Sequence, residues 1–243
     1  MKKMKIKYTT DYNIFENVIG NRNIDKRNKK RLNESMVAYN MQQPILVGPL
    51  RLNADGSFKY PLIDGMHRLV VAKELGIIVP YVISDITNEN IIDELQISKR
   101  WTALDYCNKN AAKGSHTCIV ALEICEKWYK ETNGKFSIIN GLTLLNDSYT
   151  VAIGNLLKKN TYKINIGVAD RIYAALNILK QNQNKRFNPF SAANSRAFKR
   201  LDAKVGGLDY KKIKKITKTK YLKGYSSESD NYAYLHDLYT RCK

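Results

Sequence analysis

The sequence predicts an α+β protein in which a small α/β domain, residues 1–100, is followed by a mainly helical region, residues 101–243. Up to about residue 100, strand-like segments alternate with segments of helical spacing, and after it the helical spacing continues alone. The charge changes at the same place: the first part carries 16 basic and 11 acidic residues, and the second carries 25 and 11. A hydrophobic content of 44% is typical of a folded chain.

The first predicted elements are a short strand over residues 5–9 and an amphipathic helix over residues 25–41. Asp25 stands before the helical pattern and can cap it, because a short acidic side chain accepts hydrogen bonds from the N–H groups of the first turn. The apolar positions of the helix recur every three or four residues: Leu32, Met36 and Tyr39. The opposite face is basic.

A β-hairpin is predicted next. Residues 43–52 form its first strand, with Pro44 near the start, where a missing N–H is tolerated. The Asp55–Gly56 pair is a strong hairpin-turn signal, and residues 58–64 form the returning strand.

The hairpin leads into a helix that we expect to begin just after Gly65. Its apolar stripe consists of Leu69, Ala72 and Leu75. Gly76 can end it in the left-handed conformation that a side chain disfavours. A strand over residues 77–84 and one further helix complete the domain near residue 100.

The region after residue 100 reads as a series of helices. Residues 102–114 begin with Thr102 and Asp105 in the spacing of a capping box, and residues 116–134 form a longer helix. Residues 136–160 contain two short apolar helices joined by a polar turn. This pair fits a helix-turn-helix whose second helix enters a DNA groove, and it also fits ordinary packing in a helical bundle.

The turn between the hairpin and its helix carries polar chemistry: Asp64, Gly65, Met66, His67 and Arg68. A helix that begins there has unpaired backbone N–H groups and the positive end of its dipole. Glycine lets a ligand approach the backbone, and His67 and Arg68 add donors, which together favour phosphate binding. Asp64 can cap the helix, hold a metal ion or orient Arg68. The alternative is a plain cap followed by surface residues.

The segment LIDGMHRLVVAKELGI resembles the central motif of the ParB/sulfiredoxin superfamily, in which a D-G-x-H-R or G-x-x-R turn opens a helix and binds nucleotide phosphates. Upstream, GNRNIDKRNKKRLNESMVAYNMQQPILV is similar to the opening of that domain. The resemblance covers about residues 10–100. It implies a ParB-like domain of phage or plasmid type that binds a nucleoside triphosphate, CTP or ATP, with or without Mg²⁺. It also places Arg22 near the nucleotide, although this residue fits a plain loop arginine too.

The chain departs from the family at two places. Sulfiredoxins carry a catalytic cysteine directly before the His-Arg pair, where this chain has Met66, so we do not expect sulfiredoxin chemistry. ParB-type partition proteins reach the triphosphate with a later E-N-x-x-R segment, and here Asp93 stands where the arginine would be. Some relatives hydrolyse ATP or cleave DNA. Asp64, His67 and Arg68 are therefore candidate catalytic residues of an NTPase or nuclease.

Positive charge is densest between Lys180 and Lys223, where 14 basic residues stand beside two acidic ones. Lysines neutralise phosphates, and the interleaved aromatic residues can stack on bases, so DNA is the expected partner. A short helix over residues 195–204 is predicted here, with Ser195 as its cap. The expected DNA-contacting residues are Arg196, Lys199, Arg200, Lys211, Lys212, Lys214 and Lys215. The alternative is an exposed basic face whose aromatic residues pack inward.

No segment approaches the roughly 18 consecutive apolar residues of a membrane span, and no signal-peptide pattern follows the basic start. The sequence therefore predicts a cytoplasmic protein without a membrane partner, and a homodimer is compatible with it. The four cysteines contain no C-x-x-C pair, which favours buried free thiols over a metal site. They are Cys107, Cys118, Cys125 and Cys242.

Three functions remain open at this point. The first is a ParB-like DNA-associated protein that binds a nucleotide at the 64–68 turn and DNA through its basic region. The second is a nucleotide hydrolase or nuclease that uses the same turn. The third is a structural or host-interaction protein that kept the fold without the ligand.

Overall fold

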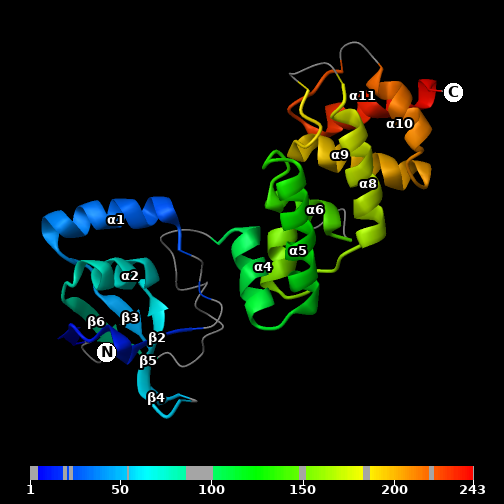
Figure 1. Ribbon diagram of the computed structural model, residues 1–243. Helices are drawn as coiled ribbons and strands as arrows, with labels where there is room; N and C mark the ends of the chain where they lie inside the picture. The colour runs from blue at the N-terminus through cyan, green and yellow to red at the C-terminus, as the bar shows by residue number, and fades with distance from the viewer. Residues whose placement is uncertain are drawn as a thin grey trace. The chain divides into compact units, whose positions relative to one another are not determined.

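The computed structural model describes residues 5–18, 21, 24–53, 55–85, 101–147, 152–182, 187–218 and 222–242. The chain divides into two compact units, residues 1–105 and residues 106–243. The first contains a mixed sheet with helices and the second is mainly helical, which confirms the predicted α+β class (Figure 1). The predicted boundary at residue 100 and the helix expected before it lie outside the described residues.

The sheet of the first unit combines parallel and antiparallel pairs. Its strands are β1 (Ile6–Thr9), β2 (Phe15–Asn17), β3 (Ile45–Val47), β4 (Arg51–Leu52), β5 (Phe58–Asp64) and β6 (Val79–Ile83). They lie in the order β1-β6-β3-β5-β2, and β4 pairs with β5 beside this path. The β1–β6 and β3–β5 pairs are antiparallel, whereas β3–β6 and β2–β5 are parallel. The seven-residue β5 thus has a neighbour on each side up to Leu62, and Asp64 at its end pairs with Leu46 of β3.

Two helices, α1 (Lys26–Tyr39) and α2 (Met66–Leu75), lie on the same side of this sheet (Figure 1). Val71 and Ala72 of α2 are fully buried and belong to one hydrophobic core with Ile45 of β3 and Leu62 of β5. Removing such side chains from water is the main favourable term for this unit. The core therefore fixes α2, and with it the turn that precedes α2.

Most predicted elements of the first unit are confirmed. The Asp25 carboxylate accepts hydrogen bonds from the N–H groups of Arg27 and Asn28 and so caps α1. Gly56 has a φ of 77° in the hairpin turn. The C-cap of α2, Gly76, has a φ of 67°. These outcomes follow from local backbone chemistry, which short sequence patterns capture well.

Three features of the first unit differ from the prediction. The strand expected over residues 43–52 is split into β3 and β4, with residues 48–50 between them outside any strand and an irregular register at Leu46–Val47. Strand β2 and the preceding 3-10 turn, residues 12–14, were not predicted, since three-residue elements have too little periodicity to detect. Tyr39 was expected on the apolar stripe of α1, but it is 70% exposed because α1 ends there.

From residue 101 onward, the described chain is mainly helical. The helices are α4 (Ala103–Ala112), α5 (His116–Glu131), α6 (Ile138–Leu145), α7 (Ile153–Lys158), α8 (Ile166–Leu179), α9 (Ala192–Val205), α10 (Tyr210–Thr217) and α11 (Glu228–Arg241). An aromatic cluster lies in the interior, where the rings of Trp128 and Tyr173 stack with their centroids 4.5 Å apart. The ring centroid of Phe136 lies 5.7 Å from the ring centroid of Tyr173 and 5.7 Å from that of Phe190. Such pairs add to the stability that area burial alone provides.

The predictions for the helical region after residue 100 had mixed outcomes. The capping box is confirmed: the N–H of Thr102 donates to the Asp105 carboxylate, 2.7 Å, and the N–H of Asp105 donates to the Thr102 hydroxyl, 3.2 Å. The cap predicted at Ser195 is wrong, because α9 begins earlier and Ser191 caps it. Residues 148–151, the centre of the suggested helix-turn-helix, lie outside the described residues. The C-terminal segment forms α11, which packs on α9.

Candidate functional site: the 64–68 turn and the basic helices

The turn from β5 to α2 depends on a glycine. Gly65 is the N-cap of α2 and has a φ of 101°, in the left-handed region that favours glycine. A Cβ at this position would lie 2.5 Å from Cγ2 and 3.0 Å from Cβ of Ile45. Both the backbone angle and the packing of β3 therefore require glycine here, whether or not a ligand binds.

Arg68 joins the first turn of α2 to two other segments. Its Nη2 donates to Oδ2 of Asp64 at 2.7 Å, and its Nη1 donates to the backbone carbonyls of Pro44, at 2.7 Å, and Gln43, at 3.3 Å. The Arg68 side chain is 17% exposed and that of Asp64 is 41% exposed. Of the three roles considered for Asp64, the structure shows the orientation of Arg68, and α2 has no side-chain cap.

His67 connects the turn to the beginning of α1. Its Nε2 accepts a hydrogen bond from the backbone N–H of Asp25 at 2.9 Å. An imidazole nitrogen that accepts must be unprotonated, so the ring is neutral in this arrangement. The side chain of Asp25 caps α1 at the same time. His67 thus positions two helix beginnings relative to each other.

The other residues predicted at this site have different positions. Met66 is partly buried and packs against the core of the first unit, so it is a structural residue here. Arg22 lies outside the described residues, as do Glu89, Asn90 and Asp93 of the segment compared with E-N-x-x-R. Across the part of the chain that the structure describes, no group of three or more His, Cys, Asp or Glu residues could hold a metal ion.

The chemistry available at the turn is anion binding. Backbone N–H groups at the beginning of a ten-residue helix point outward along its axis, and the dipole favours negative charge there. Arg68 adds a fixed positive group whose charge Asp64 partly offsets. The turn brings Asp64 and Arg68 together as the sequence predicted, but the contact of His67 is with the protein backbone.

A hollow of about 350 Å³ lies on α1 rather than at the turn. Its lining residues are Lys26, Lys29, Lys30, Asn33 and Glu34. Lys29 also forms an ion pair with Glu74 of α2, with its Nζ 2.6 Å from Oε1. Sequence analysis identified this face as basic but did not predict a hollow. The sequence contained one signal for it: these side chains are spaced three or four residues apart, which places them on one face of the helix.

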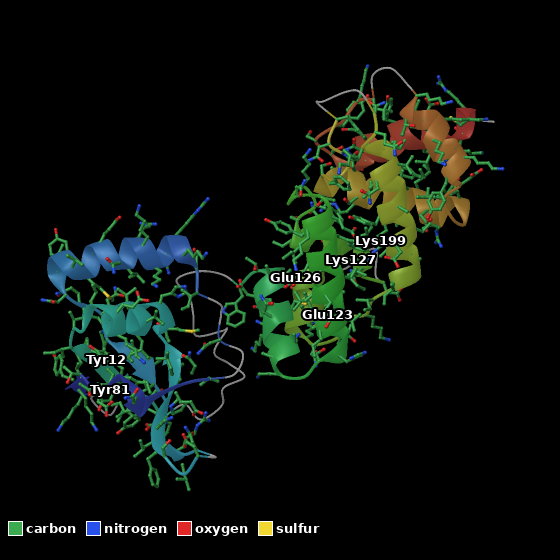
Figure 2. All side chains as sticks on the ribbon, in the orientation of Figure 1. Tyr12, Tyr81, Glu123, Glu126, Lys127 and Lys199 are labelled. Carbon is green, nitrogen blue, oxygen red and sulfur yellow. The ribbon has the colours of Figure 1, made fainter. Side chains whose placement is uncertain are left out.

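Of the three basic residues predicted to contact DNA from α9, Arg196 and Arg200 are exposed and Lys199 is buried. Figure 2 labels Lys199 among the helices of the second unit. Its side chain is 6% exposed, and its Nζ donates to the backbone carbonyls of Thr143, at 3.3 Å, and Asn146. Burial lowers the pKa of its ammonium group to about 8. Its expected place among the DNA-contacting residues is therefore corrected: it supports the C-terminal end of α6.

The two arginines of α9 face α11. Nε of Arg196 lies 3.1 Å from Oε2 of Glu228. The guanidinium carbon of Arg200 lies 4.2 Å from the centre of the Tyr232 ring, in cation–π geometry. The three phenylalanines of the basic region pack inward, as the alternative interpretation held: Phe187, Phe190 and Phe198 are buried. Tyr210 is 38% exposed, and Tyr221 lies outside the described residues.

The lysines of α10 have the opposite arrangement. Ile213 and Ile216 are buried, and the exposed lysines of this segment lie on the other side of the helix: Lys211, Lys214, Lys215 and Lys218. These four follow the i, i+3, i+4, i+7 spacing of a single helical face. Lys212 differs, because it is partly buried with its Nζ 5.1 Å from the centre of the Tyr239 ring. We call the four exposed residues the α10 lysine face.

Comparison with known proteins gives limited information. No protein-family model matches the sequence, and no curated protein matches it. One similar structure is the C-terminally truncated chromosome-partitioning protein ParB from Caulobacter crescentus complexed with CTP-gamma-S, at 17% identity and a TM-score of 0.33, covering 70% of this chain and 92% of that chain. Another is a Pnob8-like ParB-N domain, at 16% identity and a TM-score of 0.35, covering 87% and 98%. These scores carry no functional argument.

None of the described helices is both long enough and apolar enough to cross a membrane.

Proposed function

We propose that this chain is a ParB-like DNA-associated protein that contacts duplex DNA through the α10 lysine face and holds a nucleotide at the 64–68 turn. The observation that carries the proposal is the segregation of α10 into a buried isoleucine side and an exposed side with four lysines. The helix contains no acidic residue, and only its N-cap, Asp209, is acidic.

The geometry of the α10 lysine face suits a phosphate backbone. From Lys211 to Lys218 the face extends seven residues, which is about 10 Å along a helix axis. Duplex DNA presents one charge per about 1.7 Å of its axis, so several phosphates lie within that span. Each lysine that neutralises a phosphate releases a counterion, which makes binding favourable and dependent on salt.

The composition of the face favours contact with the backbone over recognition of bases. Base recognition relies mainly on arginine, asparagine and glutamine, whose planar groups form paired hydrogen bonds with base edges. The α10 lysine face presents point charges alone. We therefore expect weak sequence preference, with similar affinities for duplexes of different sequence at the same salt concentration.

The DNA part can be tested with two quadruple variants of the full chain. Changing Lys211, Lys214, Lys215 and Lys218 to Gln should reduce the steepness of the salt dependence. The slope of log affinity against log salt concentration should decrease in magnitude by about 3 to 4. The control changes four exposed lysines of other segments and has the same net charge: Lys113, Lys127, Lys130 and Lys135. Fluorescence anisotropy from 50 to 200 mM salt measures both. Equal slopes for the two variants would remove α10 from the proposal.

The nucleotide part is supported by two side chains of the turn. Arg68 is held in place by three acceptors, so it loses little freedom when it meets a phosphate. Asp64 lies beside it and is the more exposed of the two.

Asp64→Asn separates the nucleotide part from the DNA part. The amide oxygen still accepts from Arg68, but the negative charge is gone, so affinity for CTP or ATP without Mg²⁺ should rise several-fold, as expected from about 1 kcal/mol for charges 4 Å apart in water. Calorimetric titration measures this, and Glu74→Gln at the other end of α2 is the charge-matched control. Absence of binding of CTP, ATP and GTP to the unaltered protein, with and without Mg²⁺, would refute the nucleotide part.

A further inference from the structure

Two buried cysteines of the second unit are in contact. Cys107 of α4 and Cys118 of α5 are 0% and 1% exposed. The Cys107 thiol donates to the backbone oxygen of Cys118, and its Sγ lies 3.9 Å from that oxygen. The α4–α5 turn, residues 113–115, connects their helices. The Cys107 sulfur thus lies against the backbone of the residue that carries the second thiol.

The surroundings of Cys118 favour its thiolate form. Cys118 is the third residue of α5, where the helix dipole stabilises negative charge. Its sulfur accepts hydrogen bonds from Cys107 first, and also from the side chains of Ser115 and Asn110, and these lower the pKa of its thiol against the opposing effect of burial. The same contact and burial raise the pKa of the Cys107 thiol.

The third cysteine of this interior is a natural comparison. Cys125 lies two turns further along α5, away from the helix N-terminus. Burial, together with the smaller effect of the Glu126 charge, raises the pKa of its thiol to about 12. Gly141 of α6 packs so closely on it that a Cβ there would be 2.6 Å from its Sγ. Cys125 is therefore a packing residue with a protonated thiol.

We propose that Cys107 and Cys118 form an oxidisable dithiol that closes to a disulfide with hydrogen peroxide. The Cys118 thiolate attacks the peroxide, an S–O bond forms, the O–O bond breaks, and the departing hydroxide takes up a proton to become water. The Cys107 sulfur then attacks the sulfenic sulfur, an S–S bond forms, and a second water leaves with the Cys107 proton. Two thiols are oxidised and one peroxide is reduced.

The burial of the pair selects the oxidant. A bulky disulfide or maleimide cannot reach a sulfur that is 1% exposed, whereas peroxide is close to water in size. Entry requires opening of the α4–α5 turn, where Lys113 and Gly114 are exposed. We therefore expect slow, selective oxidation by peroxide and little reaction with large thiol reagents in the native state.

Peptide mapping of the full chain tests the inference. A Cys242→Ser background removes the more exposed cysteine and with it most intermolecular bonding. After peroxide treatment and alkylation without reduction, trypsin separates the two cysteines, because Lys109 and Lys113 lie between them. Additional cleavage after Glu123 separates Cys118 from Cys125. The expected product is one linked peptide pair, lighter by two hydrogen atoms and absent after reduction.

Single-cysteine substitutions show which of the two sulfurs reacts with peroxide first. Cys107→Ser should leave the Cys118 sulfenic acid unresolved, so that dimedone labels Cys118 when the protein is unfolded in its presence after the peroxide is removed, and Cys118→Ser should leave neither label nor link at Cys107. Cys125→Ala is the matched control and should keep the 107–118 link. A peroxide dose that oxidises Cys242 in the unaltered protein but forms no 107–118 link would overturn the proposal. A link that includes Cys125 would overturn it as well.

Discussion

Helices α9 and α10 have similarly basic sequences but differ in how their basic residues meet the interior. On α9, Arg196 and Arg200 are exposed beside α11, whereas Lys199 is buried. On α10, the basic side chains other than Lys212 are exposed, and Ile213 and Ile216 are buried. The difference follows from what lies opposite each helix: α9 packs on α6, α8 and α11, and Lys199 lies on the side that these neighbours cover. A basic residue therefore belongs to a basic surface only when it lies on the side of its helix that faces away from the interior.

The largest expected difference between the two helices concerns their acidic residues. Asp202 of α9 is buried and accepts two hydrogen bonds from Arg171, at 2.7 and 2.8 Å, and one from the N–H of Leu208, at 3.0 Å. Asp202→Ala leaves these donors without an acceptor and should lower the free energy of unfolding by about 3–5 kcal/mol. Asp209→Ala removes only the N-cap of α10 and should cost about 1 kcal/mol. Urea titration compares them, and equal losses would contradict the contrast.

The second prediction compares one lysine from each helix. Lys199→Met removes the donor to two carbonyls at the end of α6 and should lower the free energy of unfolding by about 2–3 kcal/mol at pH 7. Lys214→Met changes an exposed side chain and should shift the free energy of unfolding by at most about 0.5 kcal/mol. Thermal and urea unfolding measure both. A larger loss of stability for Lys214→Met than for Lys199→Met would contradict the assignment of Lys199 as the structural lysine and Lys214 as the exposed one.

The third prediction uses the pKa of Lys199. Burial lowers this pKa from 10.5 to about 8, so between these pH values the unfolded chain binds more protons than the folded protein. The free energy of unfolding should therefore rise as pH increases from 8 to 10.5, by on the order of 2 kcal/mol, relative to the Lys199→Met variant. The difference between the two proteins cancels the other titrating groups. A difference that stays constant with pH would show that Lys199 titrates normally.

The smallest effect is expected at the exposed edge of α9. Arg200→Ala removes a cation–π contact with Tyr232 and should cost about 0.5–1 kcal/mol of stability. It should leave the salt dependence of DNA binding almost unchanged, whereas Lys214→Ala should reduce that slope by about 0.9 with no loss of stability. Measuring stability and salt slope for both variants separates the two roles. If Arg200→Ala reduced the log–log salt slope of DNA affinity by about 0.9 as well, Arg200 would be a phosphate contact, and the proposed DNA-binding surface would have to include α9.

Short-range chemistry made much of the fold predictable. The Asp25 cap, the Asp55–Gly56 turn and the Thr102–Asp105 capping box each depend on a few neighbouring residues, and all three are confirmed. The start of α2 after Gly65 is confirmed for the same reason. What the sequence did not reveal were short strands such as β2, which exist only because β5 lies beside them.

The candidate sites were less predictable because their contacts are long-range. Asp64 and Arg68 are four residues apart at the beginning of α2, so their pairing could be anticipated. The contacts of Arg68 with Pro44 and of His67 with Asp25 join segments 24 and 42 residues apart. The burial of Lys199 depends on carbonyls more than 50 residues away. Helical spacing alone cannot distinguish such a lysine from an exposed one.

The close approach of Gly65 to Ile45 has a consequence for how this turn can vary. Because a methyl group at 65 would meet the Ile45 side chain at 2.5 Å, the two positions act as a matched pair across the β3–α2 junction. In a library that randomises both, Ala at 65 should survive only alongside a smaller residue at 45, and still at a reduced frequency because φ is 101°. Variation in the chemistry of this turn would then have to come from the neighbouring side chains, with the backbone at 65 kept constant.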